Sequence, residues 1–186
     1  MYAAVRAAAS ATDAWNLWRE RRERLFLTHP QSPLPPDVRT LEHAPRYFDY
    51  DDTLRFTVNI EPSDETDAPL PASQSEDFAA TRLGIARFSM KGEDCALGVY
   101  WLAGYSGGIF VSFRDATSGR ETYGAGRYLL DTAKSADLGV DHGRLVLDFN
   151  FAYQPSCSYD PKWSCPLAPR DNWLAVAIRA GERSGD

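Results

Sequence analysis

The fold is decided by residues 81–102, which read TRLGIARFSMKGEDCALGVYWL. Two runs rich in apolar residues, 81–90 and 95–102, flank the turn-forming sequence Lys91-Gly92-Glu93-Asp94. Runs of this length on either side of a short Gly-containing turn predict an antiparallel β-hairpin. The hairpin is therefore the first element that we expect.

The same strand pattern extends beyond the hairpin in both directions. Apolar and polar side chains alternate in residues 54–60, 109–113, 145–150 and 174–178, and residues 127–130 form a further short apolar run. Because successive side chains of a strand point to opposite faces, such alternation predicts half-buried strands. Seven to nine short strands separated by turns predict a mainly β fold, either an antiparallel β-barrel or a sandwich.

A helix is expected before the first strand. Residues Ser10–Asp13 have the Ser-x-x-Asp form of a helix start, and Trp15, Trp18 and Leu25 follow at helical spacings. We therefore predict an N-terminal helix over residues 12–27, packed against the sheet through its tryptophans.

Four arginines lie close together on this predicted helix. Arg19, Arg21, Arg22 and Arg24 alternate with glutamates. Such a pattern is typical of a solvated face crossed by salt bridges, and the alternative interpretation is a site for an anionic partner.

Four segments are expected to lack strands. Residues 30–36, PQSPLPP, should form an extended strap with one helical turn after it, because proline has no N–H and restricts its predecessor. Residues 61–77 are rich in Pro, Ser, Asp and Glu and predict a mobile loop. Residues 155–170 predict an irregular segment, and 181–186 a frayed tail.

Length and composition predict one domain with a hydrophobic core. The 186 residues are 44% hydrophobic, and we divide them into a helix and strap (1–45), a β domain (46–180) and a tail (181–186). The net charge of −6 repels phosphate backbones, so we expect no nucleic-acid partner. No apolar run approaches the ~20 residues that span a bilayer, and Met1–Ala14 does not resemble a signal peptide. We expect no membrane partner and, by default, a cytoplasmic protein, and the oligomeric state stays open.

Several sequence blocks carry a resemblance to a known family. They are Trp18-Arg19-x-x-Arg22, Ser32-Pro33-Leu34, Phe113–Gly119 with Glu121–Leu129, Leu147–Tyr153, and Cys157–Pro166 with Asn172 and Ala180-Gly181-Glu182. Together they resemble the bacterial and archaeal family known as domain of unknown function 1684. The resemblance covers most of the chain, and it implies no activity because none is established for the family. Relatives often carry His or another aromatic residue near the position of Lys162. This chain has Lys there, so the resemblance implies no metal role for residues 157–166.

Polar residues in the second half suggest a binding site. Asp148 and Asn150 lie two apart on a predicted strand, so their side chains share a face that is either wet or lines a concave site. Arg114 and Arg127, with the N–H groups of Gly124–Gly126, could bind an anion. These glycines do not form a Walker or Gly-x-Gly-x-x-Gly motif, so the phosphate signal is weak.

Three functional hypotheses follow from these residues. The first is a domain that binds a small polar or anionic molecule, with the carboxylate and amide near position 150 and the two arginines facing one hollow. The second is a hydrolase-like or isomerase-like enzyme with Asp148 as general base and Arg114 or Arg127 steadying an anion. The third is a non-catalytic structural or interaction protein. The predicted ligand-binding residues are Arg114, Asp115, Tyr123, Arg127, Asp148, Asn150, Tyr153, Tyr159 and Asn172.

The cysteines predict no metal centre and no cofactor. Cys157 and Cys165 have seven residues between them, and His29, His43 and His142 lie in other segments, whereas structural zinc requires four such ligands. The pair is either a disulfide that closes a small loop or two buried free thiols, and a cytosolic location favours the thiols.

Overall fold

The computed structural model describes residues 1–74, 76–103 and 107–184, and it is mostly β. A short helix α1 (Tyr2–Arg6) precedes the long helix α2 (Ala11–Thr28). The strands are β1 (Arg46–Tyr47), β2 (Arg55–Val58), β3 (Ile60–Asp67), β4 (Ala80–Met90), β5 (Glu93–Leu102), β6 (Gly108–Phe113), β7 (Arg127–Asp131), β8 (Val140–Asp141), β9 (Arg144–Asp148) and β10 (Glu182–Arg183).

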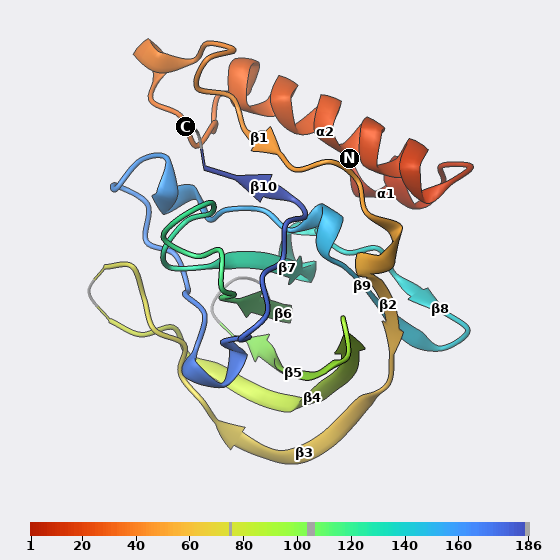
Figure 1. The fold of residues 1–186 in the computed structure, drawn as a ribbon. Coiled ribbons are helices and arrows are strands. Elements are labelled where there is room, and N and C mark those ends of the chain that lie inside the picture. Colours follow the sequence, from red (N-terminus) through yellow and green to blue (C-terminus); the bar gives the residue numbers. More distant parts are fainter. Residues whose placement is uncertain (75, 104–106, 185–186) are drawn as a thin grey trace.

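The strands form three antiparallel sheets. Their orders are β3-β4-β5-β6-β7, β2-β9-β8 and β1-β10, and none of these sheets closes on itself within the described residues. The arrangement is sandwich-like, so the prediction of an antiparallel β fold with a packed N-terminal helix is confirmed and the barrel alternative is excluded. In Figure 1 the five-stranded sheet rises from β3 at the bottom to β7 in the middle, β2, β9 and β8 lie to its right, and α2 crosses above β1 and β10.

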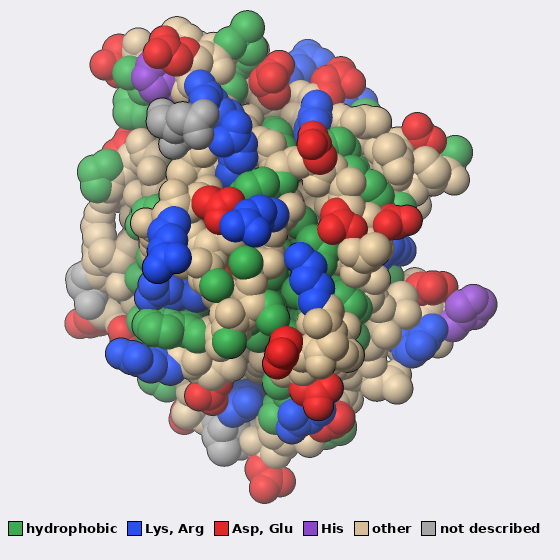
Figure 2. Space-filling model, in the orientation of Figure 1, with side chains coloured by type: hydrophobic (Ala, Val, Ile, Leu, Met, Phe, Trp, Pro, Cys, Tyr) green, Lys and Arg blue, Asp and Glu red, His purple; other side chains and the backbone are tan. Residues whose placement is uncertain are grey.

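The main core lies between the large sheet and the β2–β9 pair. Leu97, Val99 and Phe113 from the large sheet pack with Leu147 and Phe149 from β9 and the turn that follows it, and all five are fully buried. A second core cluster lies under the helices, where Trp18 is completely buried. On the surface, Figure 2 shows acidic and basic side chains interspersed over one face of the molecule.

Local sequence signals specify the hairpin and the helix start. β4 and β5 pair over their full length around Lys91-Gly92, and both turn residues have positive φ angles, as a two-residue type I′ turn requires. Ser10 is the N-cap of α2, because its Oγ accepts a hydrogen bond from the Asp13 N–H at 3.1 Å. Both predictions are confirmed, as is the helical turn after the strap, at Pro36–Val38.

The predicted mobile loop at 61–77 is wrong over its first half. Residues 60–67 form β3, an edge strand that pairs antiparallel with β4 from Ile60–Ala86 to Asp67–Thr81, with an irregularity after Pro62. An edge strand needs backbone pairing on one side only and tolerates polar side chains, so its composition resembles that of a loop.

Two predictions near the C-terminus are also wrong. Residues 174–178 are not a strand, although Leu174 and Ile178 are buried against the core, because their backbone makes only scattered hydrogen bonds with residues 114–116. The predicted frayed tail instead contains β10, which pairs with β1, and its Glu182 is completely buried, while residues 185–186 of that prediction lie outside the described residues. No helix in the described part of the chain is long and apolar enough to cross a membrane.

Candidate functional site

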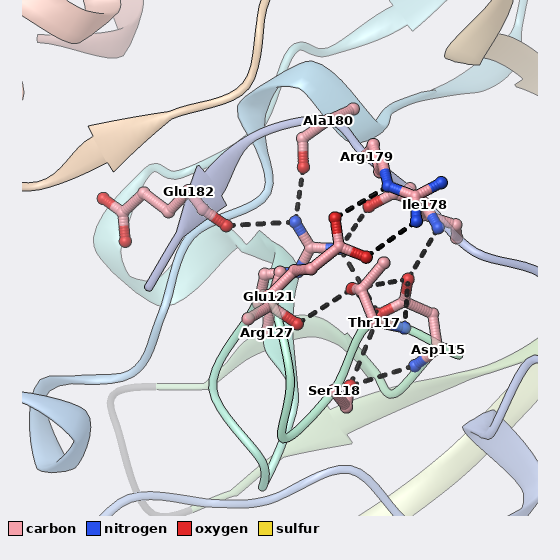
Figure 3. A network of polar contacts seen from close by, with 10 residues as sticks. Asp115, Thr117, Ser118, Glu121, Arg127, Ile178, Arg179, Ala180 and Glu182 are labelled. Carbon is pink, nitrogen blue, oxygen red and sulfur yellow. Dashed lines mark hydrogen bonds and ion pairs between the residues drawn. The ribbon is translucent and has the colours of Figure 1, made fainter. Parts of the chain in front are cut away.

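Arg127 and Asp115 form a buried network (Figure 3). The Arg127 guanidinium donates to the backbone carbonyls of Ile178, Ala180 and Glu182, and its Nη2 lies 3.4 Å from Asp115 Oδ1. Asp115 also accepts the Ile178 N–H at 2.7 Å. The Glu182 carboxylate points away from this network. The arrangement fixes the irregular chain 178–182 to the sheet and leaves Arg127 only 1% exposed.

Asp148 and Asn150 belong to a different network. The Asn150 side chain donates to the Asp51 carbonyl and accepts the Asp51 N–H, and its Nδ2 also donates to Asp148 at 2.8 Å. Arg55 Nη1 lies 3.5 Å from the Asp148 carboxylate. Burial raises the pKa of Asp148 above its usual value, although these hydrogen bonds partly oppose the shift. The pair holds the chain before β2 against the end of β9.

Arg114 and Asn172 lie side by side, because the Arg114 N–H donates to the Asn172 carbonyl at 3.0 Å. The Arg114 guanidinium stacks on the Trp173 ring, 4.0 Å from its centroid. Asn172 is completely buried, and its amide bonds to Gly98 N, Gly98 O and Ser112 O. Asn172 therefore cross-links β5 and β6, and both of its side-chain N–H groups are used in doing so.

The predicted common hollow is therefore not formed. Asp148 and Asn150 bond to residues 51–55, whereas Arg127 bonds to Asp115 and residues 178–182, and Arg114 stacks elsewhere. The sequence placed these side chains together because strand alternation gives the face of a residue but not its partner. They act mainly as internal cross-links of the fold.

The three predicted tyrosines do line hollows, but in two different places. Tyr123 and Tyr159 line one of about 380 Å³ beside β1 and β10, together with Arg46 and Arg183. Tyr153 lines another of about 410 Å³ beneath α2, which we call the helix-side hollow.

The helix-side hollow has an aromatic wall with a few polar groups. The aromatic side chains are Tyr2, Phe26, Tyr128, Tyr153 and Trp163. The polar ones include Arg22, Gln31, Lys134, Gln154, Ser156, Ser164 and Cys165. The Tyr128 hydroxyl donates to the Pro166 carbonyl at 2.6 Å and so fixes one edge of the hollow.

Arg22 and Glu182 form a buried ion pair at the hollow. Arg22 Nε donates to Glu182 Oε1 at 2.6 Å, and the guanidinium lies over the Tyr153 ring. Glu182 Oε2 accepts from the Gln154 N–H at 2.7 Å and the Tyr159 hydroxyl at 3.1 Å. Burial alone would lower the pKa of Arg22, but Glu182 raises it, so Arg22 stays charged and paired.

The sequence interpretation missed Arg22, because it placed all four arginines on a solvated face. Arg22 is only 8% exposed. A signal was available, since Arg22 follows Trp18 by four residues and precedes Phe26 by four, which puts it on the apolar stripe of α2.

One buried donor at the hollow has no partner. Gln154 is 7% exposed, and its side-chain Nε2 makes no hydrogen bond with any residue that the structure describes. Gln154 lines both hollows. A buried amide without a partner is costly, so this nitrogen is a candidate contact for an acceptor oxygen.

The cysteines are free thiols in this structure. The Cys157 N–H donates to Cys165 Sγ at 3.4 Å, and the Tyr123 hydroxyl lies 3.9 Å from Cys157 Sγ. Hydrogen bonds from Cys165, and also from Ser73 and Tyr123, lower the pKa of Cys157 to about 6 despite its partial burial. The same thiol pairing raises the pKa of Cys165. No group of three or more metal-ligating side chains occurs among the described residues.

These features define a mostly β protein with an aromatic hollow beneath its N-terminal helix. The sequence matches the family "Protein of unknown function (DUF1684)" over residues 43–183, and the chain belongs to that family. It is also similar to an uncharacterized protein from Haloarcula marismortui whose solution NMR structure is known. The two are 34% identical with a TM-score of 0.62, over 94% of this chain and 96% of the other. No functionally curated protein is detectably similar to this chain.

Proposed function

We propose that this protein is a binding domain for a small aromatic molecule that carries a carbonyl or carboxylate group. The observation that carries the proposal is the helix-side hollow, with its aromatic wall and the unpartnered Gln154 amide. Its volume of about 410 Å³ lies in the range of small-molecule sites, which is roughly 300–1,000 Å³.

The wall chemistry favours an aromatic body. Tyr128 and Tyr153 already stack edge to face at 5.5 Å, and such rings add aromatic contacts worth about 0.5–1.5 kcal/mol each beyond area burial. Arg22 is neutralised by Glu182, so it would contribute packing rather than free charge. Lys134, which also pairs with Asp131, lies at an exposed position of the wall and could attract an acidic group.

Binding is favoured over catalysis by the composition of the wall. None of the three histidines lines the helix-side hollow, and neither does Asp148. The hydrolase-like alternative needs Asp148 beside Arg114 or Arg127, and these groups belong to separate networks. A cytoplasmic location, which we also propose, suits the free thiols.

The first test uses three matched probes: phenylacetate, phenylacetamide and ethylbenzene, which has no acceptor oxygen. We expect ligand-detected NMR to show binding, and Ser164→Trp to weaken it at least about tenfold because the indole would enter the hollow from its exposed rim. Thr12→Trp, on the exposed face of α2 away from the hollow, is the matched control and should bind like the original protein.

A second variant assigns the polar contact. Gln154→Leu should weaken phenylacetamide binding by about two- to tenfold, because a lost hydrogen bond costs roughly 0.5–1.5 kcal/mol. Ethylbenzene binding should be unchanged. Failure of all three probes to bind at millimolar concentration, or binding that Ser164→Trp leaves intact, would contradict the proposed site.

A further inference from the structure

The loop between Cys157 and Cys165 brings two thiols together in a region without strand pairing. Cys157 lies in a short helical turn, Ser156–Ser158, and the Cys165 N–H donates to Ser73 Oγ at 2.9 Å. Cys165 is thus anchored to the segment around Ser73, while the seven residues between the two cysteines form no strand pairing. The Cys157 N–H donates to Cys165 Sγ at 3.4 Å, so the Cys165 sulfur lies against Cys157.

We propose that Cys157 and Cys165 form a redox-active dithiol that exchanges with small disulfides. Cys157 is the partly exposed member, so it can meet a solvent-borne disulfide, whereas Cys165 is only 7% exposed. This difference assigns Cys157 as the attacking thiol and Cys165 as the resolving thiol. The assignment does not depend on ligand binding in the helix-side hollow.

The exchange balances in two steps. The Cys157 thiolate attacks one sulfur of a disulfide RS–SR, the S–S bond breaks, and the first RS⁻ leaves with the electron pair and takes a proton from water. Cys165 then loses its proton to solvent and attacks the Cys157 sulfur of the mixed disulfide, which releases the second RS⁻. The protein loses two electrons and two protons, and the small disulfide is reduced to two thiols.

The surroundings of Cys157 support its role as nucleophile. The Tyr123 hydroxyl, 3.9 Å from Cys157 Sγ, can donate to a thiolate, and so can the Cys165 thiol. These contacts keep the pKa of Cys157 low, so that a large share of it is thiolate near neutral pH. Tyr123 is therefore a positioning residue for the reaction.

Oxidation would also reach the helix-side hollow. Cys165 is part of its wall, together with Ser164 and Pro166. A disulfide between Cys165 and Cys157 would replace the Cys165 thiol in the wall of the hollow by a disulfide sulfur. Cys95 offers an internal comparison, because it is buried on β5 in the main core cluster, which contains neither of the other two cysteines.

The experiment equilibrates the full-length reduced protein with mixtures of reduced and oxidised glutathione, then counts free thiols by alkylation and mass spectrometry. We expect three free thiols under reducing conditions and one under oxidising conditions, with a peptide that links Cys157 to Cys165. Cys95→Ser should keep this two-thiol transition. Cys165→Ser should stop at a glutathione adduct on Cys157, and Cys157→Ser should form neither product.

The pH dependence of alkylation provides an independent measurement. Iodoacetamide should modify Cys157 with a half-maximal rate near pH 6, against about 8.5 for an ordinary thiol. Tyr123→Phe should move this midpoint to higher pH without unfolding the protein. Three free thiols at every glutathione ratio, or a Cys165→Ser variant without an adduct on Cys157, would overturn the proposal.

Discussion

Two buried arginines in this protein have different surroundings. Arg127 donates to three backbone carbonyls and Asp115, and it lies within the packed interior. Arg22 has one carboxylate partner, Glu182, and one side of it borders a hollow. Burial and pairing alone therefore do not identify a functional arginine, and the space beside it is the more informative feature.

The largest expected effect tests the Arg127 network. Arg127→Met would leave Asp115 buried without its cation and three carbonyls without a donor. Breaking a buried pair in this way typically costs about 3–5 kcal/mol, which urea denaturation would measure. Arg144→Met, at an exposed position on β9, should change the free energy of unfolding by less than about 0.5 kcal/mol. Equal losses for the two variants would show that the network is not structural.

A smaller loss is expected at the ion pair of Arg22. Tyr159→Phe removes the hydroxyl that donates to Glu182 at 3.1 Å. A hydrogen bond to a charged group contributes about 1.5–3 kcal/mol, and partial exposure of Tyr159 places the expected loss near the lower value. Tyr50→Phe, whose hydroxyl makes no hydrogen bond within the described residues, is the matched control. If both variants unfold at the same urea concentration, the Tyr159 hydroxyl does not stabilise Glu182 and its ion pair with Arg22.

The smallest expected effect is a pH dependence at Asp148. Burial raises the pKa of Asp148 in the folded protein, so the folded protein binds a proton at this carboxylate more readily than the unfolded chain does. The resulting stabilisation is fully present below the unfolded pKa near 3.9 and is lost as the pH rises through the folded value. Asp148→Asn should lack this contribution, so the stability of the original protein relative to the variant should fall as the pH rises above about 4. A difference that stays constant, or that grows with pH, would contradict a raised pKa.

Much of the fold was predictable because its signals are local. The Lys91-Gly92 turn fixes the β4–β5 hairpin, and Ser10 fixes the start of α2. Edge strand β3 and terminal strand β10 were missed, because their pairing depends on distant partners rather than on their own apolar content. The family resemblance was confirmed by the match over residues 43–183.

The candidate site was less predictable than the fold. Sequence reasoning selected Asp148, Asn150 and Arg127 for their polarity, and the structure places them in internal networks. Tyr153, which it also selected, lines a hollow, whereas Arg22, which it assigned to solvent, is buried. Polarity in a sequence indicates that a group needs a partner, and it does not show whether that partner is the protein itself.

The sequence by itself determined a mainly β chain with a capped N-terminal helix, because side-chain periodicity and turn residues act over a few neighbours. Only the tertiary structure decided that α2 carries Arg22 onto Glu182 of the last strand, 160 residues away, and that a hollow remains beside this pair. The physical reason is that hydrogen-bond partners and cavities arise from packing between distant segments, which no local pattern records.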